Sequence, residues 1–293
     1  MTVLCIGECM AELAPTDASD GYRLGFAGDT FNTAWYLARL GVEVCYLSAV
    51  GDDAISDRML AAMAADGVDA THVARIEGAT VGLYMISLAD GERSFAYWRG
   101  QSAARRLADD PARLARAMAG ASTIYLSGIT LAILAPDARA RLLGALETAR
   151  ADGRTVAFDP NLRPRLWTDA AEMTDAVMAA AALADIALPS HDDEARWFGD
   201  ADPRATAARY AGAGARTVVV KDGDGPVLWR ERAEAGEVPV APVREVVDST
   251  AAGDSFNAGF LAARLRGAPM PEAVSAGCAL AARVVGGRGA LVS

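Results

Sequence analysis

The sequence is poor in cysteine and lacks a long apolar run. Only four of its 293 residues are cysteine, and the one close pair, Cys5 and Cys9, does not form a CxxC motif. A disulfide framework is therefore not indicated, and a reduced cytoplasmic compartment fits best. No apolar stretch reaches the ~18 residues that span a membrane, and residues 1–10 lack the features of a signal peptide. We expect neither secretion nor a membrane partner.

Basic charge is also scarce. The 28 lysines and arginines are outnumbered by 38 aspartates and glutamates, which gives a formal net charge of −10. Binding a nucleic acid requires a basic surface that releases counterions, so a nucleic-acid partner is not expected. A small anionic substrate is compatible with this charge, because a few local arginines can outweigh a dispersed negative surface. Hydrophobic residues are abundant at 52%, which is enough for a large globular core.

The order of apolar segments indicates an α/β fold. Short β-rich runs recur at residues 3–7, 43–50, 123–128, 155–159, 186–189 and 217–221. Between them, helical three-and-four spacing that stops at glycine is found in segments such as 30–41, 54–67 and 136–153. Alternating strands and helices predict a three-layer α/β/α domain with a mostly parallel central sheet. Ligands are then expected outside the carboxyl ends of the strands. We expect one domain over residues 1–293.

Two segments, about 8–27 and 80–99, break this rhythm. In the second, two alternating strand-like halves flank Asp90 and Gly91, a dipeptide typical of hairpin turns. We predict that the two segments form a small antiparallel β lid over the ligand end of the sheet. Because such a lid exposes one face and two edges, we also expect it to form a homo-oligomer contact.

The most informative stretch lies at residues 246–265, where a strand-like end is followed by small residues and an apolar helix. Ala251, Ala252 and Gly253 leave their backbone N–H groups free to face an open site, where the helix dipole favours an anion. Asp254 follows in the first helical turn, where its carboxylate could accept a proton from a substrate hydroxyl. The alternative is a well-capped helix without a catalytic role, since Asp in a first turn stabilises helices generally.

The DSTAAGD motif at 248–254 resembles the DTxGAGD signature of the PfkB, or ribokinase-like, sugar kinases. The resemblance implies a ribokinase-like fold and ATP-dependent phosphoryl transfer. Asp254 would be the catalytic base, and the three preceding amides would hold the transferred phosphoryl group, with Gly253 also near the nucleotide. Ala251 replaces the first glycine of the signature, which implies a slightly different turn. The 2-keto-3-deoxygluconate kinase branch of the family resembles this alanine version.

A second resemblance lies at residues 25–41, which are similar to the N-terminal glycine signature of the family. It implies a sugar site in which Gly28 lets substrate hydroxyls approach the backbone, while Asp29 and Asn32 supply short polar groups. The alternative is an ordinary helix start, with Asp29 as its cap and Asn32 in solvent.

A nucleotide site is suggested by KDGDGP at 221–226. In the family this turn covers ATP, which implies nucleotide contacts for Lys221, Gly223 and Gly225. Considered by itself, the segment is equally a plain β-turn.

A magnesium site is suggested by SHDDE at 190–194, which lies where the family has an NxxE motif that organises Mg²⁺ and phosphate through water. Ser190 replaces asparagine, and Asp193 occupies the glutamate position with Glu194 beside it. Carboxylates suit hydrated Mg²⁺, although acidic runs are usually solvated helix starts. A potassium requirement is left open.

Two arginines near the predicted lid and the ligand end of the sheet suggest an acidic sugar. Arg99 ends the lid's YWR run and Arg163 follows the strand at 155–159. A guanidinium grips a carboxylate with two parallel hydrogen bonds, an arrangement that a neutral sugar would leave unsatisfied. Alternatively, Arg99 is a solvated lid residue and Arg163 forms a loop salt bridge.

The segments GERSFAYWR, YLSGITLAIL and DPNLRPRLW resemble 2-keto-3-deoxygluconate kinases. That resemblance implies substrate contacts at Gly28, Tyr84, Tyr97, Arg99, Arg163 and Asp254. It further implies phosphorylation of the terminal C6 hydroxyl of 2-keto-3-deoxygluconate. Tyr84 and Tyr97 could equally pack within the lid.

Four alternative functions are considered from the sequence. A kinase of the same family could act on ketodeoxygalactonate, fructose, ribose or a nucleoside. Gly253, Asp254 and Ser255 spell the GDS of some serine hydrolases, but the only histidines, His72 and His191, do not follow that motif's usual order. No GxGxxG follows the first strand, which disfavours a dinucleotide-binding oxidoreductase. A non-catalytic sugar sensor would be expected to lack Asp254.

Overall fold

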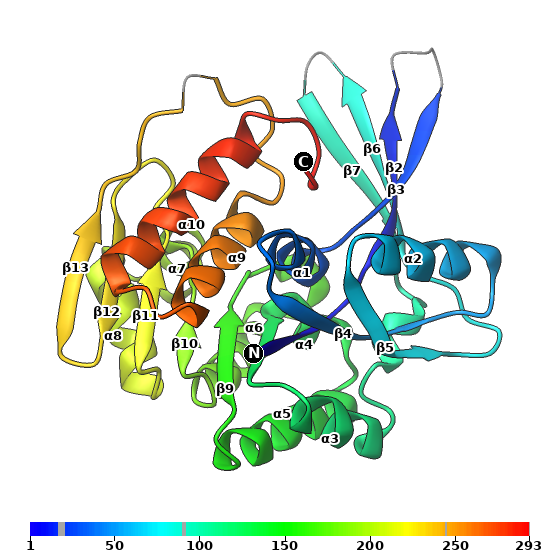
Figure 1. The fold of residues 1–293 in the computed structure, drawn as a ribbon, viewed down its shortest axis with the longest axis horizontal. Helices are drawn as coiled ribbons and strands as arrows, with labels where there is room; N and C mark the ends of the chain where they lie inside the picture. Colours follow the sequence, from blue (N-terminus) through cyan, green and yellow to red (C-terminus); the bar gives the residue numbers. More distant parts are fainter. Residues whose placement is uncertain (17–20, 90–91, 244, 293) are drawn as a thin grey trace.

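The computed structural model describes residues 1–16, 21–89, 92–243 and 245–292. A large sheet is covered by helices on both faces, and a smaller sheet projects from one of its edges (Figure 1). The three-layer α/β/α fold predicted from the sequence is confirmed, whereas a single domain over the whole chain stays a prediction. No helix in the described part of the chain is long and apolar enough to cross a membrane.

In the described ranges the large sheet has nine strands, in the order β13-β12-β11-β10-β9-β8-β1-β4-β5. From β5 to β11 all neighbouring strands are parallel, and β12 and β13 are antiparallel additions at one edge. The six apolar runs noted in the sequence all form strands. Their bounds and those of the other strands are β1 (Thr2–Ile6), β4 (Glu43–Val50), β5 (Val68–Arg75), β8 (Thr123–Ser127), β9 (Thr155–Asp159), β10 (Ile186–Ala187), β11 (Thr217–Val220), β12 (Val227–Glu231) and β13 (Glu234–Val238).

The strand at the other edge, β5, was missed in the sequence because it is an edge strand with mixed exposure. Only its first residue, Val68, is fully buried, so it contains no continuous apolar run. Its position beside β4 leaves one side of its backbone unpaired within the sheet, as expected for an edge.

Helices connect the parallel strands. The helices are α1 (Asp29–Arg39), α2 (Ala54–Ala65), α3 (Pro111–Ala119), α4 (Gly128–Ile133), α5 (Pro136–Ala151), α6 (Ala170–Ala181), α7 (His191–Phe198), α8 (Pro203–Ala213), α9 (Ala252–Leu265) and α10 (Met270–Val285), with short 3-10 turns η1 (Ala103–Arg106) and η2 (Pro164–Leu166). The three helices predicted over 30–41, 54–67 and 136–153 are all present. Each is followed within two residues by a glycine with positive φ, which is the conformation that ends helices without strain.

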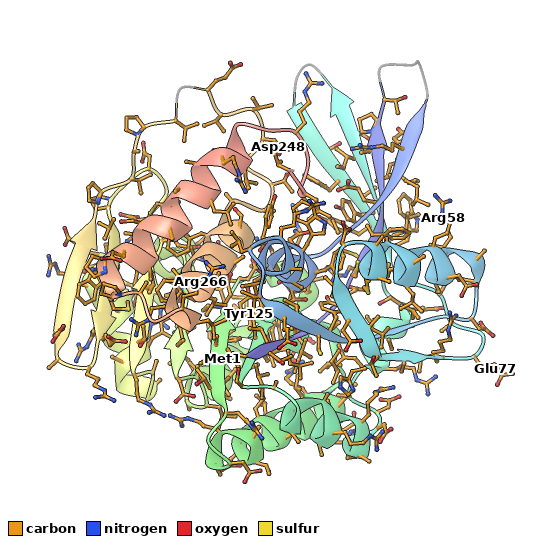
Figure 2. The ribbon with its side chains drawn as sticks, viewed as in Figure 1. Met1, Arg58, Glu77, Tyr125, Asp248 and Arg266 are labelled. Carbon is orange, nitrogen blue, oxygen red and sulfur yellow. The ribbon has the colours of Figure 1, made fainter. Side chains whose placement is uncertain are left out.

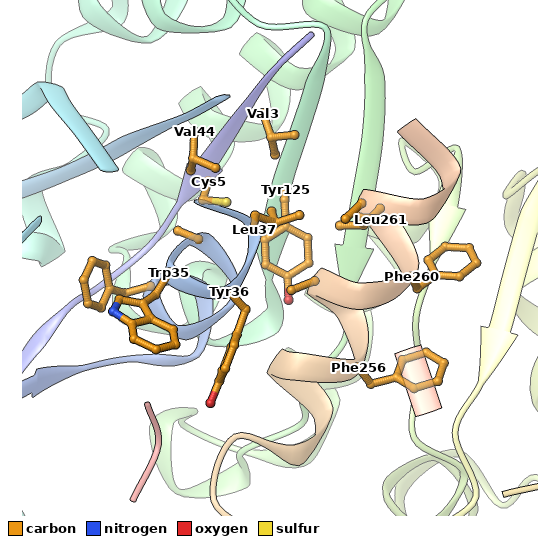
Figure 3. Close-up of a cluster of buried hydrophobic side chains, with 14 of the residues drawn as sticks. Val3, Cys5, Trp35, Tyr36, Leu37, Val44, Tyr125, Phe256, Phe260 and Leu261 are labelled. Atoms are coloured by element: carbon orange, nitrogen blue, oxygen red, sulfur yellow. The ribbon is translucent and has the colours of Figure 1, made fainter. Parts of the chain in front are cut away.

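Two hydrophobic cores lie on opposite faces of the sheet. Side chains alternate along β1, so Val3 and Cys5 face one core while Leu4 and Ile6 face the other. Figure 3 shows the first core, where Val3 and Cys5 lie close to Leu37 of α1 and Leu261 of α9. Strands buried on both faces read as continuous apolar runs, which explains why these strands could be recognised in the sequence.

The lid is a four-stranded sheet in the order β3-β2-β6-β7, formed by β2 (Met10–Pro15), β3 (Tyr22–Ala27), β6 (Leu83–Ala89) and β7 (Glu92–Trp98). Both predicted lid segments contribute two antiparallel strands. The central pair, β2 and β6, is parallel, because both strands leave the main sheet in the same direction. The predicted turn at Asp90 and Gly91 lies outside the described residues.

Candidate active site

A cavity of ≈ 720 Å³ lies at the carboxyl ends of the parallel strands, beneath the lid. Its walls come from the lid, the start of α1, the β9–η2 connection and the start of α9. The lining residues are Met10, Gly28, Asp29, Asn32, Tyr84, Phe95, Tyr97, Arg99, Ile129, Asp159, Asn161, Arg163, Pro164, Arg165, Leu166, Ser190, Asp193, Lys221, Ser249, Thr250, Ala251, Ala252, Gly253, Asp254 and Ala290. The cavity therefore brings together most of the residues that the sequence singled out.

A wider hollow of ≈ 960 Å³ lies at the opposite, amino-terminal edge of the sheet. Four of its charged side chains pair with one another, Arg216 with Asp185 and Arg264 with Glu231. The cavity beneath the lid is the stronger candidate for a ligand site, because it lies at the carboxyl ends of the parallel strands, where open α/β sheets bind their ligands.

The start of α9 presents backbone amides to the cavity. Ala251 precedes the helix with φ 61°, and no described side chain caps the helix. The Ala252 amide donates to the Ser249 carbonyl oxygen at 3.2 Å, whereas no described hydrogen bond engages the amides of Ala251 and Gly253. An uncapped helix start of this kind favours an anion, both through its free N–H groups and through the helix dipole.

Asp254 connects this helix start to α1. Its Oδ2 atom accepts a hydrogen bond from Asn32 Nδ2 at 2.8 Å, and the Thr33 hydroxyl donates to its carbonyl oxygen at 3.2 Å. Burial of the side chain and, to a smaller extent, the nearby Asp29 carboxylate together raise the pKa of Asp254 to about 8, against the opposing effect of the Asn32 hydrogen bond. A carboxyl group with such a pKa can take up a proton near neutral pH and release it again.

Asp29 lies beside Asp254 and is held from the other side of the cavity. Asn161 Nδ2 donates to Asp29 Oδ2 at 2.8 Å. Burial raises the pKa of Asp29 above its ordinary value, although the hydrogen bonds that it accepts oppose this. Asn161 itself has φ 36°, a left-handed conformation that asparagine adopts more readily than most residues. Asn161 was not predicted as a site residue, although its position two residues after the buried strand β9 could have indicated one.

Lys221 belongs to a buried polar network at the floor of the cavity. Its Nζ atom donates to Asp159 Oδ2 and to Asn257 Oδ1, each at 3.2 Å. Asn257 Nδ2 in turn donates to Asp159 at 2.6 Å and to the hydroxyl of Tyr125 at 3.0 Å. A Cβ atom placed on Gly253 would lie 3.6 Å from Lys221 Nζ, so the ammonium group adjoins the uncapped helix start.

Of the residues predicted for nucleotide and metal, the structure brings Ser190 and Asp193 to the cavity together with Lys221. Gly223 and Gly225 do not line it. They lie in the connection between β11 and β12, where Gly223 has φ 58° and the Gly225 amide donates to the Asp222 carbonyl oxygen at 2.7 Å.

Glu194 points away from the cavity. It is fully buried, and its carboxylate accepts hydrogen bonds from Arg209 Nη2 at 2.7 Å and the Tyr210 hydroxyl at 3.0 Å. Burial raises its pKa to about 7. This carboxylate is engaged in the interior, so in this structure it does not lie where the predicted magnesium site would be.

The two arginines predicted to bind an acid both line the cavity, together with Arg165. Arg163 Nη1 donates to Asp193 Oδ2 at 3.4 Å and to the Leu162 carbonyl oxygen at 2.7 Å, so the loop salt bridge weighed for it is present. Burial raises the pKa of Asp193, and the Arg163 charge opposes this. Arg99 is not a solvated lid residue, because its side chain is 12% exposed and ion-paired with Glu8.

The lid contributes aromatic rings to the cavity. Tyr84 and Tyr97 have ring centroids 5.8 Å apart, and Phe95 stacks on Tyr97 at 6.3 Å. The Tyr84 hydroxyl donates to the buried carboxylate of Glu12. Since its proton is used there, Tyr84 can offer only acceptor lone pairs to a ligand.

The structure opposes the serine-hydrolase alternative. Ser255 is fully buried and its hydroxyl donates to the Ala252 carbonyl oxygen at 3.0 Å. His191 Nδ1 is bonded to the Thr206 hydroxyl at 3.1 Å, and His72 lies in β5. A nucleophilic serine requires an exposed oxygen beside a base, which Ser255 lacks.

The C-terminal segment closes the cavity from the side of α9. Asp248, placed near the end of α10 in Figure 2, accepts hydrogen bonds from the Thr250 hydroxyl at 2.7 Å and the Gly289 amide at 2.6 Å. Tyr36 of α1 donates to the Ala290 carbonyl oxygen at 2.8 Å. These contacts hold the Ala251 turn between α1 and the end of the chain.

Comparison with known proteins identifies the class. The model of the pfkB family of carbohydrate kinases matches residues 2–293, so the chain belongs to that family. It is 41% identical to the 2-dehydro-3-deoxygluconokinase of Dickeya dadantii, over 99% of this chain and 96% of that protein.

Two solved structures share the fold over 99% of this chain. One is the fructokinase of Xylella fastidiosa with bound ATP, at 27% identity and a TM-score of 0.83, with 93% of that chain covered. The other is an E. coli protein assigned to Ribokinase II, in complex with ATP and Mg²⁺, at 26% identity and a TM-score of 0.86, with 94% of that chain covered.

The left-handed conformation of Ala251 leads to a stability prediction. This backbone geometry costs an alanine about 1–2 kcal/mol but is readily adopted by glycine. We expect Ala251→Gly to raise the free energy of unfolding by roughly 0.5–1 kcal/mol, measured by urea denaturation. Ala61→Gly is the control, since Ala61 is exposed in the interior of α2 and its replacement should lower stability by about the same amount. Equal destabilisation by both variants would show that Ala251 is not strained.

Proposed function

We propose that this chain transfers the terminal phosphoryl group of ATP to the C6 hydroxyl of 2-keto-3-deoxygluconate, also called 2-dehydro-3-deoxygluconate. The products are 2-keto-3-deoxy-6-phosphogluconate and ADP. The observation that carries the proposal is the position of Asp254, which lies between the polar start of α1 and an uncapped helix start that favours phosphate. The similarity to the 2-dehydro-3-deoxygluconokinase of Dickeya dadantii supports the choice of substrate.

In this proposal Asp254 is the catalytic base. Its carboxylate accepts the proton of the C6 hydroxyl while that oxygen forms a bond to phosphorus, and the bond from phosphorus to the leaving ADP oxygen breaks. Asp254 finishes protonated, which its raised pKa favours. The amide of Gly253 and the ammonium group of Lys221 lie where they can stabilise the charge on the moving phosphoryl group.

The nucleotide would lie along Lys221, Ser190 and the start of α9. No group of three or more His, Cys, Asp or Glu side chains suited to a metal ion occurs among the described residues. A single carboxylate such as Asp193 fits Mg²⁺, because this ion keeps several waters and is held largely by substrate phosphates. Bound Mg²⁺ would neutralise phosphate charge during the transfer.

The sugar acid would lie between the lid and α1. We assign its carboxylate to Arg99 and Arg163, and its hydroxyls to Gly28, Asp29, Asn32 and the acceptor oxygen of Tyr84. Tyr97 and Phe95 would cover the apolar face of the carbon chain and exclude water when the lid closes. Exclusion of water favours transfer to the sugar over hydrolysis of ATP.

A substrate panel tests this proposal. ADP release would be measured with ATP and Mg²⁺, in potassium and in sodium buffer, for 2-keto-3-deoxygluconate, 2-keto-3-deoxygalactonate, gluconate, fructose and ribose. We expect 2-keto-3-deoxygluconate to have the highest kcat/KM. It should exceed fructose and ribose by at least about tenfold, because the arginines of the cavity would be left unsatisfied by a neutral sugar. A preference for fructose or ribose would support the kinase activity but contradict the proposed acidic substrate.

The role of Asp254 predicts both a loss of rate and a change in pH dependence. Asp254→Asn should lower kcat by roughly 10²- to 10⁴-fold while leaving thermal unfolding largely unchanged. In the wild type, kcat/KM should fall as the pH drops below about 8, because protonated Asp254 cannot act as a base. The residual activity of the variant should lack this acid limb. A variant that folds and retains full activity would exclude Asp254 as the base.

The lid also supports a proposed homo-oligomer. Trp98 lies opposite Leu83 at the edge strand β7 and is 56% exposed, and Tyr22 is exposed on the other edge strand. Exposed aromatic side chains beside unpaired strand edges are typical of contact surfaces.

We expect light scattering after gel filtration to give a mass well above the 30.4 kDa of one chain. Trp98→Asp should shift the protein towards the monomer. Ile55→Asp, which changes a 39% exposed apolar residue of α2 outside the lid sheet, should not. A monomeric wild type would reject the oligomer.

A cytoplasmic location belongs to the same proposal. It is supported by the four cysteines, all of which are free thiols in the structure. Recovery of the protein in a membrane or secreted fraction would contradict it.

A further inference from the structure

A buried carboxylate lies behind the cavity at the base of the lid. Glu8 follows β1 and is only 2% exposed, which is unusual for a glutamate without a close cation. The chain leaves the main sheet here to enter the lid, and it returns from the lid at Arg99. Glu8 does not line the cavity, but Met10, two residues further on, does.

The cation beside Glu8 is Arg99. Glu8 Oε2 accepts a hydrogen bond from Arg99 Nη2, and the two side chains are 1% and 12% exposed. Gly82 packs against the pair so closely that a Cβ atom there would lie 2.7 Å from Glu8 Oε1 and 3.3 Å from Arg99 Cβ. The ion pair is therefore enclosed where the first and last lid strands meet the main sheet.

The pair is not fully satisfied within the described part of the chain. Arg99 Nε is buried without a hydrogen-bond partner there, and the hydroxyl of Ser102 adjoins the Glu8 carboxylate. A charged pair with unmet hydrogen-bonding capacity is costly to bury, and packing alone would be served as well by apolar side chains. The presence of the Glu8–Arg99 ion pair at this place therefore suggests a role beyond holding the lid together.

The geometry points to Glu8 as a positioning residue for recognition of the substrate carboxylate, acting through Arg99. Arg99 donates a hydrogen bond from its Nη2 atom to Glu8, and this bond restricts the rotation of the long arginine side chain. Arg99 also lines the cavity. An arginine side chain that is already held in one orientation loses less conformational entropy on binding a carboxylate than a freely rotating arginine does. This inference rests on the proposed function, in which Arg99 binds the acid.

The test compares Glu8→Gln with wild type in the full-length protein. The glutamine keeps the volume but removes the charge that orients Arg99. We expect KM for 2-keto-3-deoxygluconate to rise about tenfold, with kcat within about threefold and KM for ATP unchanged, because binding of the acid and not phosphoryl transfer is affected. Glu8→Asp, which keeps the charge on a shorter side chain, should give an intermediate KM.

Glu172→Gln is the matched control. Glu172 pairs with Arg139 at 3.0 Å, and that arginine side chain is also 12% exposed, but neither residue lines the cavity. This variant should leave KM for the acid unchanged. Equal shifts in the two glutamine variants would show that Glu8 matters only for general stability and would overturn the inference.

A double variant shows whether Glu8 acts through Arg99. Arg99→Met alone should raise KM for the acid, and adding Glu8→Gln should raise it no further, because the residue being positioned is already gone. Additive effects would overturn the inference. If Glu8→Gln does not fold, the double variant, which leaves no unpaired buried charge, and Glu8→Asp give the answer. An unchanged KM for the acid in Glu8→Asp would then contradict the positioning role of Glu8.

The outcomes separate this inference from the proposed function. A wild type that prefers a neutral sugar overturns both. A wild type that prefers the acid, with Arg99→Met impaired and Glu8→Gln unaffected, overturns only the positioning role of Glu8.

Discussion

The parallel pairing of the central strands is the constraint on which the site depends. Parallel strands end at the same edge of a sheet, so the segment after each strand is delivered to one place. Glu8 follows β1, Asp159 ends β9, Ser190 follows β10 and Lys221 follows β11. The helices α1 and α9 start at this same edge, so their positive ends and first-turn carboxylates face the same cavity.

Charge in the cavity is arranged in pairs before any ligand binds. Lys221 is matched by Asp159, and Arg163 lies near Asp193. Asp29 and Asp254 have no cation in hydrogen-bond contact among the described residues. Burial raises the pKa of both, and the Asp29 charge adds to the increase at Asp254. The protein thereby keeps a proton acceptor with a high proton affinity beside a helix start that attracts anions. Such preorganised charge needs little rearrangement during a reaction.

The lid combines apolar cover with fixed polar groups. Its aromatic rings can exclude water, while two buried glutamates determine what its polar side chains offer. Glu12 accepts a hydrogen bond from the Tyr84 hydroxyl, and Glu8 accepts one from Arg99. Both glutamates lie on the first lid strand or just before it, so this single segment orients two groups that reach the cavity from the second lid hairpin.

Local pattern in the sequence was enough to determine six buried strands, three glycine-terminated helices, the lid and the first-turn position of Asp254, because each depends on residues close together in the chain. Which side chains meet was decided by the order of the strands and the packing of the helices. Asn32 and Asp254 are 222 residues apart but share a hydrogen bond, and nothing near either residue indicates the other. Glu194 looked like its neighbour Asp193 in the sequence, yet the helical turn directs it to Arg209 in the interior. Successive residues on a helix point in different directions, so only the tertiary structure could separate the two carboxylates.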